Sequence, residues 1–173
     1  PKGEPDRKYA MDPVAVRLQE LLGEPVVKLD AAVGPGVVEA LDDWDGRGVV
    51  LLENSRFYPG ETSNDPRFAD QLAALADVYV DVAFGAAHRA HATTVGVAER
   101  MPAAAGLLMK DEIDYLDKVL QDSERPFVAI LGGAKVSDKL GVIESLLGTA
   151  ESLLRGGAMC FTFFEALGHE VGD

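Results

Sequence analysis

The sequence predicts an α/β protein with a parallel sheet, and three observations support this prediction. Short runs rich in valine and leucine recur along the 173 residues. Longer segments whose apolar residues follow helical spacing lie between these runs, an alternation typical of parallel strands joined by helices. Basic or glycine-rich segments follow several runs, at the edge where a parallel sheet binds its ligands. We therefore expect a Rossmann-like, three-layer α/β/α architecture.

Five strand-like runs account for the predicted sheet. Each is short, dominated by valine and leucine, and bounded by turn-forming or helical segments. In chain order they are residues 26–29, 48–52, 77–82, 127–131 and 153–155.

Helical patterns fill the segments between these runs. Residues 11–22 space their valines and leucines for one apolar face, and residues 138–147 form a second such pattern. The sequence Asn64-Asp65-Pro66 predicts a capped helix over residues 67–76, with proline at the first helical position. Gly34-Pro35-Gly36 opens like a dinucleotide fingerprint, but Glu39 stands where the third glycine would be, so we expect only a turn and a helix start there.

The longest helical pattern divides the chain into two parts. It covers residues 105–122 and ends before Ser123-Glu124-Arg125-Pro126. We expect parts of two domains, residues 1–104 and 123–173, joined by this helix. A helix inside one continuous sheet is the alternative that the pattern leaves open.

Composition and charge restrict the possible partners. The net charge of −13 would repel a polyphosphate backbone, so we expect no nucleic-acid partner. The apolar run near residues 103–109 is too short to cross a bilayer, and we expect no membrane partner. The single cysteine, Cys160, cannot form an internal disulfide, which fits a reducing, cytoplasmic setting. A small anionic substrate is still possible, because it requires only local positive charge.

Three motifs could supply that charge. ENSRF, residues 53–57, and FGAAHRAH, residues 84–91, each follow a strand-like run with basic side chains. LGGAKVSDK, residues 131–139, combines two glycines with Lys135 and Lys139. Glycines let backbone amides approach an anion, and lysines supply charge for a phosphoryl group. The three motifs together favour a phosphate-handling site.

Each motif also has an alternative interpretation. Arg56 could be an ordinary surface arginine, and Glu53 and Asn54 are more consistent with loop-capping groups than with an acid or base. His88 and His91 are three residues apart and could bind zinc, but a third ligand would have to come from elsewhere, so we expect no metal site. The pattern GxxxxGK[ST] does not occur, so the sequence does not support a P-loop kinase.

The motifs, with GVIESL and GGAMCFTF after them, resemble the phosphoglycerate kinase family in order and spacing from residue 1 to residue 173. The resemblance implies reversible phosphoryl transfer between 1,3-bisphosphoglycerate and ADP in glycolysis, in an enzyme expected to be a monomer. It implies a substrate domain in residues 1–104 and the start of a nucleotide domain in residues 123–173. The family's first strand and loop would precede this chain, and its Mg²⁺ ligand and much of its nucleotide domain would follow.

The resemblance also implies roles for individual residues. Lys135 would face the transferred phosphoryl group as the catalytic residue, Arg56 and Arg89 would hold the substrate phosphate, and His88 and His91 would lie nearby. The residues expected to border ATP or ADP with Mg²⁺ are Gly132, Gly133, Ala134, Lys135, Lys139, Gly156 and Gly157.

Four positions depart from the family's usual residues: Ser55, Val82, Arg155 and Glu165. A charge at Arg155 would be costly if that strand were central. We expect the 173 residues alone to be inactive in phosphoryl transfer. The alternative function is a non-catalytic anion-binding or assembly fragment of the enzyme. A nicotinamide-dependent oxidoreductase would need the glycine fingerprint that the chain lacks.

Overall fold

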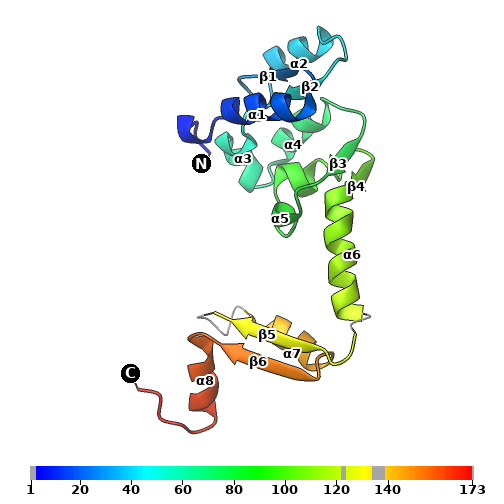
Figure 1. The fold of residues 1–173 in the computed structure, drawn as a ribbon. Helices are drawn as coiled ribbons and strands as arrows, with labels where there is room; N and C mark the ends of the chain where they lie inside the picture. Colours follow the sequence, from blue (N-terminus) through cyan, green and yellow to red (C-terminus); the bar gives the residue numbers. More distant parts are fainter. Residues whose placement is uncertain (1–2, 122–123, 134–138, 173) are drawn as a thin grey trace. The chain divides into compact units, whose positions relative to one another are not determined.

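The computed structural model describes residues 3–121, 124–133 and 139–172. The chain forms two compact units, Pro1–Glu112 and Ile113–Asp173. The division between them falls within one helix, α6 (Leu107–Gln121), which Figure 1 traces between the two units. The predicted domain limits at residues 104 and 123 stay a prediction, and each unit is described by itself below.

The strands form three parallel pairs, which confirms the predicted α/β class. The pairs are β1 (Val26–Lys28) with β2 (Val49–Leu51), β3 (Tyr79–Asp81) with β4 (Ala103–Ala105), and β5 (Val128–Gly132) with β6 (Ser152–Gly156). Every predicted run overlaps a strand. Each described sheet has two strands: the first unit holds two separate pairs, β1–β2 and β3–β4, and the second unit holds the pair β5–β6.

Strand β4 was missed by the sequence analysis, which began a helix at Ala105. Three consecutive alanines carry little β-propensity, so the sequence offers no strand signal there. The backbone decides instead, because the amide of Tyr79 donates to the carbonyl of Pro102 at 2.9 Å and the amide of Gly106 donates to the carbonyl of Asp81 at 2.8 Å. These bonds continue the β3–β4 ladder and delay the helix to Leu107.

The helices agree with the predicted patterns to within a few residues. Asp65 caps α4 (Pro66–Ala73) by accepting a hydrogen bond from the amide of Phe68 at 2.9 Å, with Pro66 in the first turn as expected. None of the described helices is both long and apolar enough to cross a membrane. The remaining helices are α1 (Asp12–Leu22), α2 (Pro35–Asp42), α3 (Pro59–Thr62), α5 (Phe84–Ala87), α7 (Leu140–Leu147) and α8 (Met159–Ala166), with short helical turns η1 (Arg7–Tyr9), η2 (Ser55–Phe57) and η3 (Ala92–Gly96).

A small core in the first unit joins the segments that follow two of the motifs. Phe68, Ala69 and Ala92 are buried together. The ring of Tyr58, which follows ENSRF, stacks on Phe68 with centroids 5.1 Å apart, and the Tyr58 hydroxyl accepts a hydrogen bond from the amide of Ala32 at 3.1 Å. Because Ala92 directly follows His91, this core holds the ends of both basic loops.

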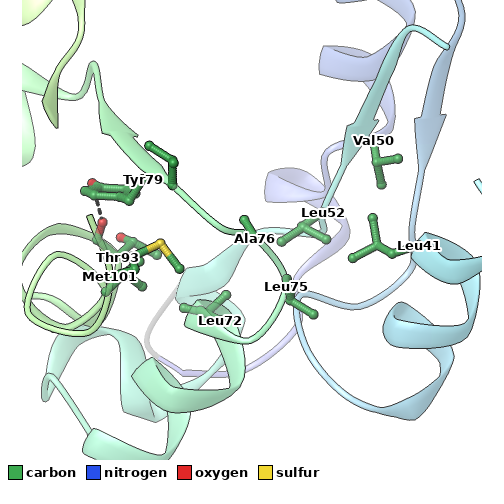
Figure 2. A pocket seen from close by; sticks show the side chains of 11 residues that line it. Leu41, Val50, Leu52, Leu72, Leu75, Ala76, Tyr79, Thr93 and Met101 are labelled. Carbon is green, nitrogen blue, oxygen red and sulfur yellow. Dashed lines mark hydrogen bonds between the residues drawn. The ribbon is translucent and has the colours of Figure 1, made fainter. Parts of the chain in front are cut away.

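An apolar cavity of about 310 Å³ separates strands β2 and β3. Figure 2 shows Val50 and Leu52 on one side of the cavity and Tyr79 on the other, with Leu72 between them. The Tyr79 hydroxyl donates to the carbonyl of Thr93 at 2.6 Å, so it is already engaged. The walls therefore offer few polar groups that could bind an anion. Strands β2 and β3 lie on opposite sides of the cavity and do not pair with each other.

The second unit buries one face of its strand pair. Ala129 of β5, Ile143 of α7 and Met159 of α8 are buried, whereas Ile130 is 76% exposed, so neighbouring residues on the strand face opposite sides. Cys160 is free and only half-buried.

Arg155 of β6 contacts an aromatic ring. Its side chain is exposed in the described unit, and its guanidinium carbon lies 3.7 Å from the centroid of the Phe163 ring. A cation placed over an aromatic face is attracted to it while remaining hydrated.

Gly96→Ala is expected to lower the free energy of unfolding by about 1–3 kcal/mol, because the core has no room for the added methyl group. A Cβ at Gly96 would lie 2.5 Å from Asn64 Oδ1 and 2.7 Å from Ala69 Cβ. Urea unfolding followed by circular dichroism measures the change. Gly36→Ala is the matched control, since a Cβ there meets nothing within 4 Å; equal effects of the two substitutions would contradict the packing argument.

Candidate functional site

A second cavity, of about 350 Å³, lies where two of the basic motifs meet in the first unit. Its wall combines residues 54–56 after β2, residues 79–83 of β3 and the segment that follows it, and residues 86, 91, 93 and 94. Arg56 and His91 both line it, so two predicted site residues from different motifs share one wall. Glu61 and Asp81 also contribute to the wall.

The ENSRF loop is fixed by its own side chains. Glu53 Oε1 accepts hydrogen bonds from the amides of Asn54 at 2.7 Å and Met11 at 3.0 Å. Asn54 Oδ1 accepts from the amide of Arg56 at 3.0 Å, and Asn54 Nδ2 donates to the carbonyl of Tyr9 at 2.9 Å. The geometry agrees with the interpretation of Glu53 and Asn54 as loop-capping groups.

Lys28 holds this loop from the neighbouring strand. Its Nζ lies 2.9 Å from Glu53 Oε2, 2.9 Å from Asp30 Oδ1 and 3.3 Å from Asp12 Oδ2. Hydrogen bonds to Glu53 and then to Asp30 raise the pKa of Lys28. Burial alone would raise the pKa of Glu53, but hydrogen bonds from Lys28 and from the two amides outweigh it and lower that pKa. The sequence analysis did not identify this pair.

Arg56 is anchored through its backbone and not through its guanidinium. Its carbonyl accepts from the amide of Gly3 at 3.1 Å, and its side chain is half-buried. Within the described residues, the Arg56 guanidinium has no hydrogen-bond or ion-pair partner. Arg100, by contrast, donates to the carbonyls of Gly96 at 2.8 Å and Pro66 at 3.1 Å. A half-buried cation without a protein partner is available to an anion.

The FGAAHRAH loop divides its basic residues between two environments. His88 and Arg89 are exposed after α5, and Arg89 Nε donates to His88 Nε2 at 3.3 Å. Neither residue is among those that line the cavity. His91 is only 7% exposed and lies in the cavity wall. The structure therefore brings His91 together with Arg56 and leaves His88 and Arg89 at the surface of the same loop.

Glu61, which the sequence analysis missed, joins the two loops. It is 2% exposed, and its carboxylate accepts hydrogen bonds from Thr93 Oγ1 at 2.6 Å and the amide of Thr93 at 3.1 Å. The pKa of Tyr79 is raised to about 12. Burial is the largest cause, followed by the charge and the hydrogen bond of Asp81 and then by the charge of Glu61. No local pattern marks Glu61, because its partners come from a segment about thirty residues later.

The glycines of the second unit meet at the carboxyl ends of β5 and β6. Gly132 pairs with Gly156 in the strand register, and the carbonyl of Gly133 accepts from the amide of Met159 at 2.9 Å. A Cβ on Gly157, which has φ +69°, would lie 2.9 Å from the oxygen of Gly133. The two loops approach so closely that this position requires glycine.

Lys139 approaches the same glycine pair. A Cβ on Gly133 would lie 2.8 Å from Lys139 Nζ, so the ammonium group is next to the backbone of this turn. Ala134 and Lys135 lie outside the described residues. Of the predicted nucleotide-binding residues, those that the structure describes therefore gather at one sheet edge.

The remaining predictions concern metals and unusual residues. Within the described ranges no group of three or more His, Cys, Asp or Glu side chains could hold a metal ion. Ser55 and Val82 both line the second cavity, so these two departures from the family's residues bear on the site itself. Glu165 is exposed on α8.

Comparison with known proteins gives one consistent family. The family model described as phosphoglycerate kinase matches residues 1–173. A phosphoglycerate kinase of Rubrobacter xylanophilus is 73% identical over 172 residues, covering 99% of this chain and 44% of the relative. The phosphoglycerate kinase of Dictyoglomus turgidum is 55% identical, covering 99% of this chain and 43% of the relative.

Solved structures agree. Phosphoglycerate kinase from Coxiella burnetii matches with a TM-score of 0.78 and 35% identity, covering 100% of this chain and 43% of that one. The enzyme from Pyrococcus horikoshii matches with a TM-score of 0.79 and 30% identity, covering 98% of this chain and 45% of that one. The chain thus spans less than half the length of the relatives it matches.

Glu53→Gln is expected to destabilise the first unit by about 2 kcal/mol near neutral pH, because it leaves Lys28 without its nearest buried carboxylate. The pKa of Glu53 is lowered in the folded protein, so its stabilisation is complete above the unfolded pKa and is lost as the pH falls through the folded one. The difference between wild type and Glu53→Gln should therefore shrink below about pH 4.

Chemical denaturation at a series of pH values measures this difference. Glu39→Gln, an exposed acid on α2, is the control for the loss of one charge. A gap between Glu53→Gln and wild type that stays constant down to acid pH would show that the Glu53 charge is not responsible.

Proposed function

The chain belongs to the phosphoglycerate kinase family, and on this premise we propose that it contributes to an enzyme that reversibly transfers a phosphoryl group between 1,3-bisphosphoglycerate and ADP. The products of the forward reaction are 3-phosphoglycerate and ATP. The observation that carries the proposal is the cavity lined by both Arg56 and His91, in which the guanidinium has no partner among the described residues. We assign this cavity to the substrate phosphate.

Charge and geometry support the assignment. A guanidinium offers planar, paired donors that match a phosphate group, and partial burial strengthens each contact. His91 supplies a second donor from a different segment. Arg89 and His88 are exposed on the same loop and contribute positive charge near the cavity. With a chain charge of −13, such a local concentration of cations is what makes an anionic substrate possible.

The nucleotide site belongs to the glycine loops of the second unit. Gly132, Gly133, Gly156 and Gly157 leave the backbone accessible at one sheet edge, and Lys139 brings an ammonium group to it. This combination suits the phosphates of ATP or ADP. When bound, Mg²⁺ would neutralise nucleotide phosphate charge. The described residues of this edge include no carboxylate cluster for Mg²⁺, so we assign its protein ligand to another part of the enzyme.

The proposed mechanism is mainly electrostatic. Lys135, a residue outside those that the structure describes, is assigned to the transferred phosphoryl group on the resemblance alone. In-line transfer concentrates negative charge on equatorial oxygens, and positioned cations stabilise that charge. We further propose that the enzyme is a cytoplasmic monomer that acts on small molecules and does not bind nucleic acid or membranes.

Arg56→Ala is expected to weaken 3-phosphoglycerate binding by at least about tenfold, because charge-assisted hydrogen bonds to phosphate are lost. Isothermal titration calorimetry on the 173-residue chain measures the affinity directly. Arg17→Ala is the matched control, since Arg17 is exposed on α1 and paired with Glu20. Equal affinities of Arg56→Ala and wild type would refute the assignment of the cavity.

Lys139→Ala is expected to weaken ADP binding about fivefold or more while leaving 3-phosphoglycerate binding unchanged, because Lys139 belongs to the second unit. Titration of each ligand separately tests this separation, with Lys118→Ala on α6 as the control lysine. The same samples, assayed for ATP formation, should show no transfer by the isolated chain. Binding of 3-phosphoglycerate without any binding of nucleotide would favour the non-catalytic alternative.

A further inference from the structure

The buried carboxylate of Glu61 has no part in the function proposed above. It lies on α3, five residues after Arg56, and is 2% exposed. Burying a charged group costs several kcal/mol unless it is paired or hydrogen-bonded. A buried acid beside a candidate anion cavity therefore requires a physical explanation, especially since a negative charge should repel the anion.

The neighbours of this carboxylate lie at the end of the FGAAHRAH motif and directly after it. Thr93 supplies its hydroxyl at 2.6 Å to Oε1 and its amide at 3.1 Å to Oε2. The third neighbour is Nδ1 of His91, 3.5 Å from Oε1, in a ring whose side chain is 9% exposed. Through these contacts α3 is held against the segment that carries His91 and Thr93.

The imidazole of His91 can carry its proton on either nitrogen, and its neighbours decide which. Nδ1 faces the Glu61 carboxylate, which can only accept. The His91 side chain also caps the amide of Thr94. That amide already donates to the carbonyl of His91 at 3.2 Å. A hydrogen on Nδ1 would point at the charged acceptor, and the amide of Thr94 would keep the carbonyl of His91 as its own acceptor.

We propose that Glu61 is a positioning residue of the anion cavity, acting through His91. Its carboxylate holds the hydrogen of His91 on Nδ1 and stabilises the ring as a cation when an anion binds. The proposal rests on the proposed function, because it assumes that the cavity binds phosphate. It assigns to Glu61 a favourable effect on anion binding, opposite in sign to the repulsion expected from its own charge.

Other charged groups act on the same ring. Arg56 from η2, and Asp81 and Tyr79 from β3, line the cavity with His91. Arg89 is two residues before it, and its carbonyl accepts a hydrogen bond from Thr94 Oγ1 at 2.7 Å. The carboxylate of Asp81 accepts from the amide of Ala83 at 2.8 Å. Among the carboxylates of the described residues, only that of Glu61 lies within 4 Å of a His91 ring nitrogen.

The first test reads the position of the hydrogen without any ligand. Long-range ¹H–¹⁵N correlation spectra of the ¹⁵N-histidine-labelled chain, recorded at about pH 8.5 where imidazole is ordinarily neutral, distinguish protonated from unprotonated ring nitrogens. The chain has three histidines, and His88→Asn and His169→Asn assign the signals. The expected result is a protonated Nδ1 in His91. An unprotonated Nδ1 in the wild-type chain would overturn the proposal.

The substitution Glu61→Gln should move the ring hydrogen of His91 from Nδ1 to Nε2. The backbone amide of Thr93 can only donate, so the glutamine oxygen must face it, and the glutamine NH₂ must take the position of Oε1. That group donates to His91 Nδ1, and the hydrogen of the ring should move to Nε2. Thr93→Val removes a neighbouring hydrogen bond but keeps the carboxylate, so it should leave the hydrogen on Nδ1.

The second test is the affinity for 3-phosphoglycerate, measured by calorimetry. Glu61→Gln should weaken binding about threefold to tenfold, because the cationic ring loses its partner. Glu99→Gln, an exposed acid of the same unit, should change it little. Stronger or unchanged binding by Glu61→Gln would overturn the proposal, since simple removal of a repelling charge gives that result. In a His91→Asn background, Glu61→Gln should strengthen binding.

The two tests also separate this proposal from the proposed function. If the wild-type chain does not bind 3-phosphoglycerate, the proposed function fails, and the proposed role of Glu61 in anion binding fails with it. The histidine spectra would still show whether Glu61 sets the state of His91. If the chain binds the substrate but Glu61→Gln leaves both readouts unchanged, the proposed function stands and the role of Glu61 is refuted.

Discussion

A buried carboxylate must find donors inside the protein, and the first unit depends on this constraint. Glu53 and Glu61 are both buried beside loops that a parallel sheet would otherwise leave free. Glu53 pairs with Lys28 and accepts hydrogen bonds from two backbone amides. Glu61 accepts hydrogen bonds from Thr93 and lies next to His91. Each carboxylate therefore fixes a loop at a strand exit, since removing either would leave donors in a poorly hydrated place.

The same rule explains which cations are available for a ligand. Lys28 is surrounded by carboxylates and Arg100 by carbonyls and Asp70, so both serve the fold. Arg56 is held by its backbone, and its guanidinium has no protein partner in the described part of the chain. An excess of acidic residues is thus compatible with an anion site, because the acids neutralise structural cations and leave a few others unpaired.

The strands and helix starts that could be predicted are those whose signal lies in consecutive residues. The runs that became β1, β2, β3, β5 and β6 are rich in branched side chains, and the Asp65 cap and Pro66 mark a helix start directly. Strand β4 could not be predicted, because its alanines have no strand preference and only pairing with β3 defines it. Likewise, Glu61 sits in an unremarkable Pro-Gly-Glu turn, and its importance comes from a segment distant in sequence.

By itself, the sequence determined the α/β class, the parallel strand direction and the motifs that identify the family, because these depend on local periodicity and on the residues themselves. Tertiary structure decided which motif residues share a cavity: His91 joins Arg56, whereas His88 and Arg89 stay at the surface. It also decided which acids are buried and which strands pair. These outcomes depend on contacts between distant segments, and the free energy of such contacts is not encoded in any single stretch of chain.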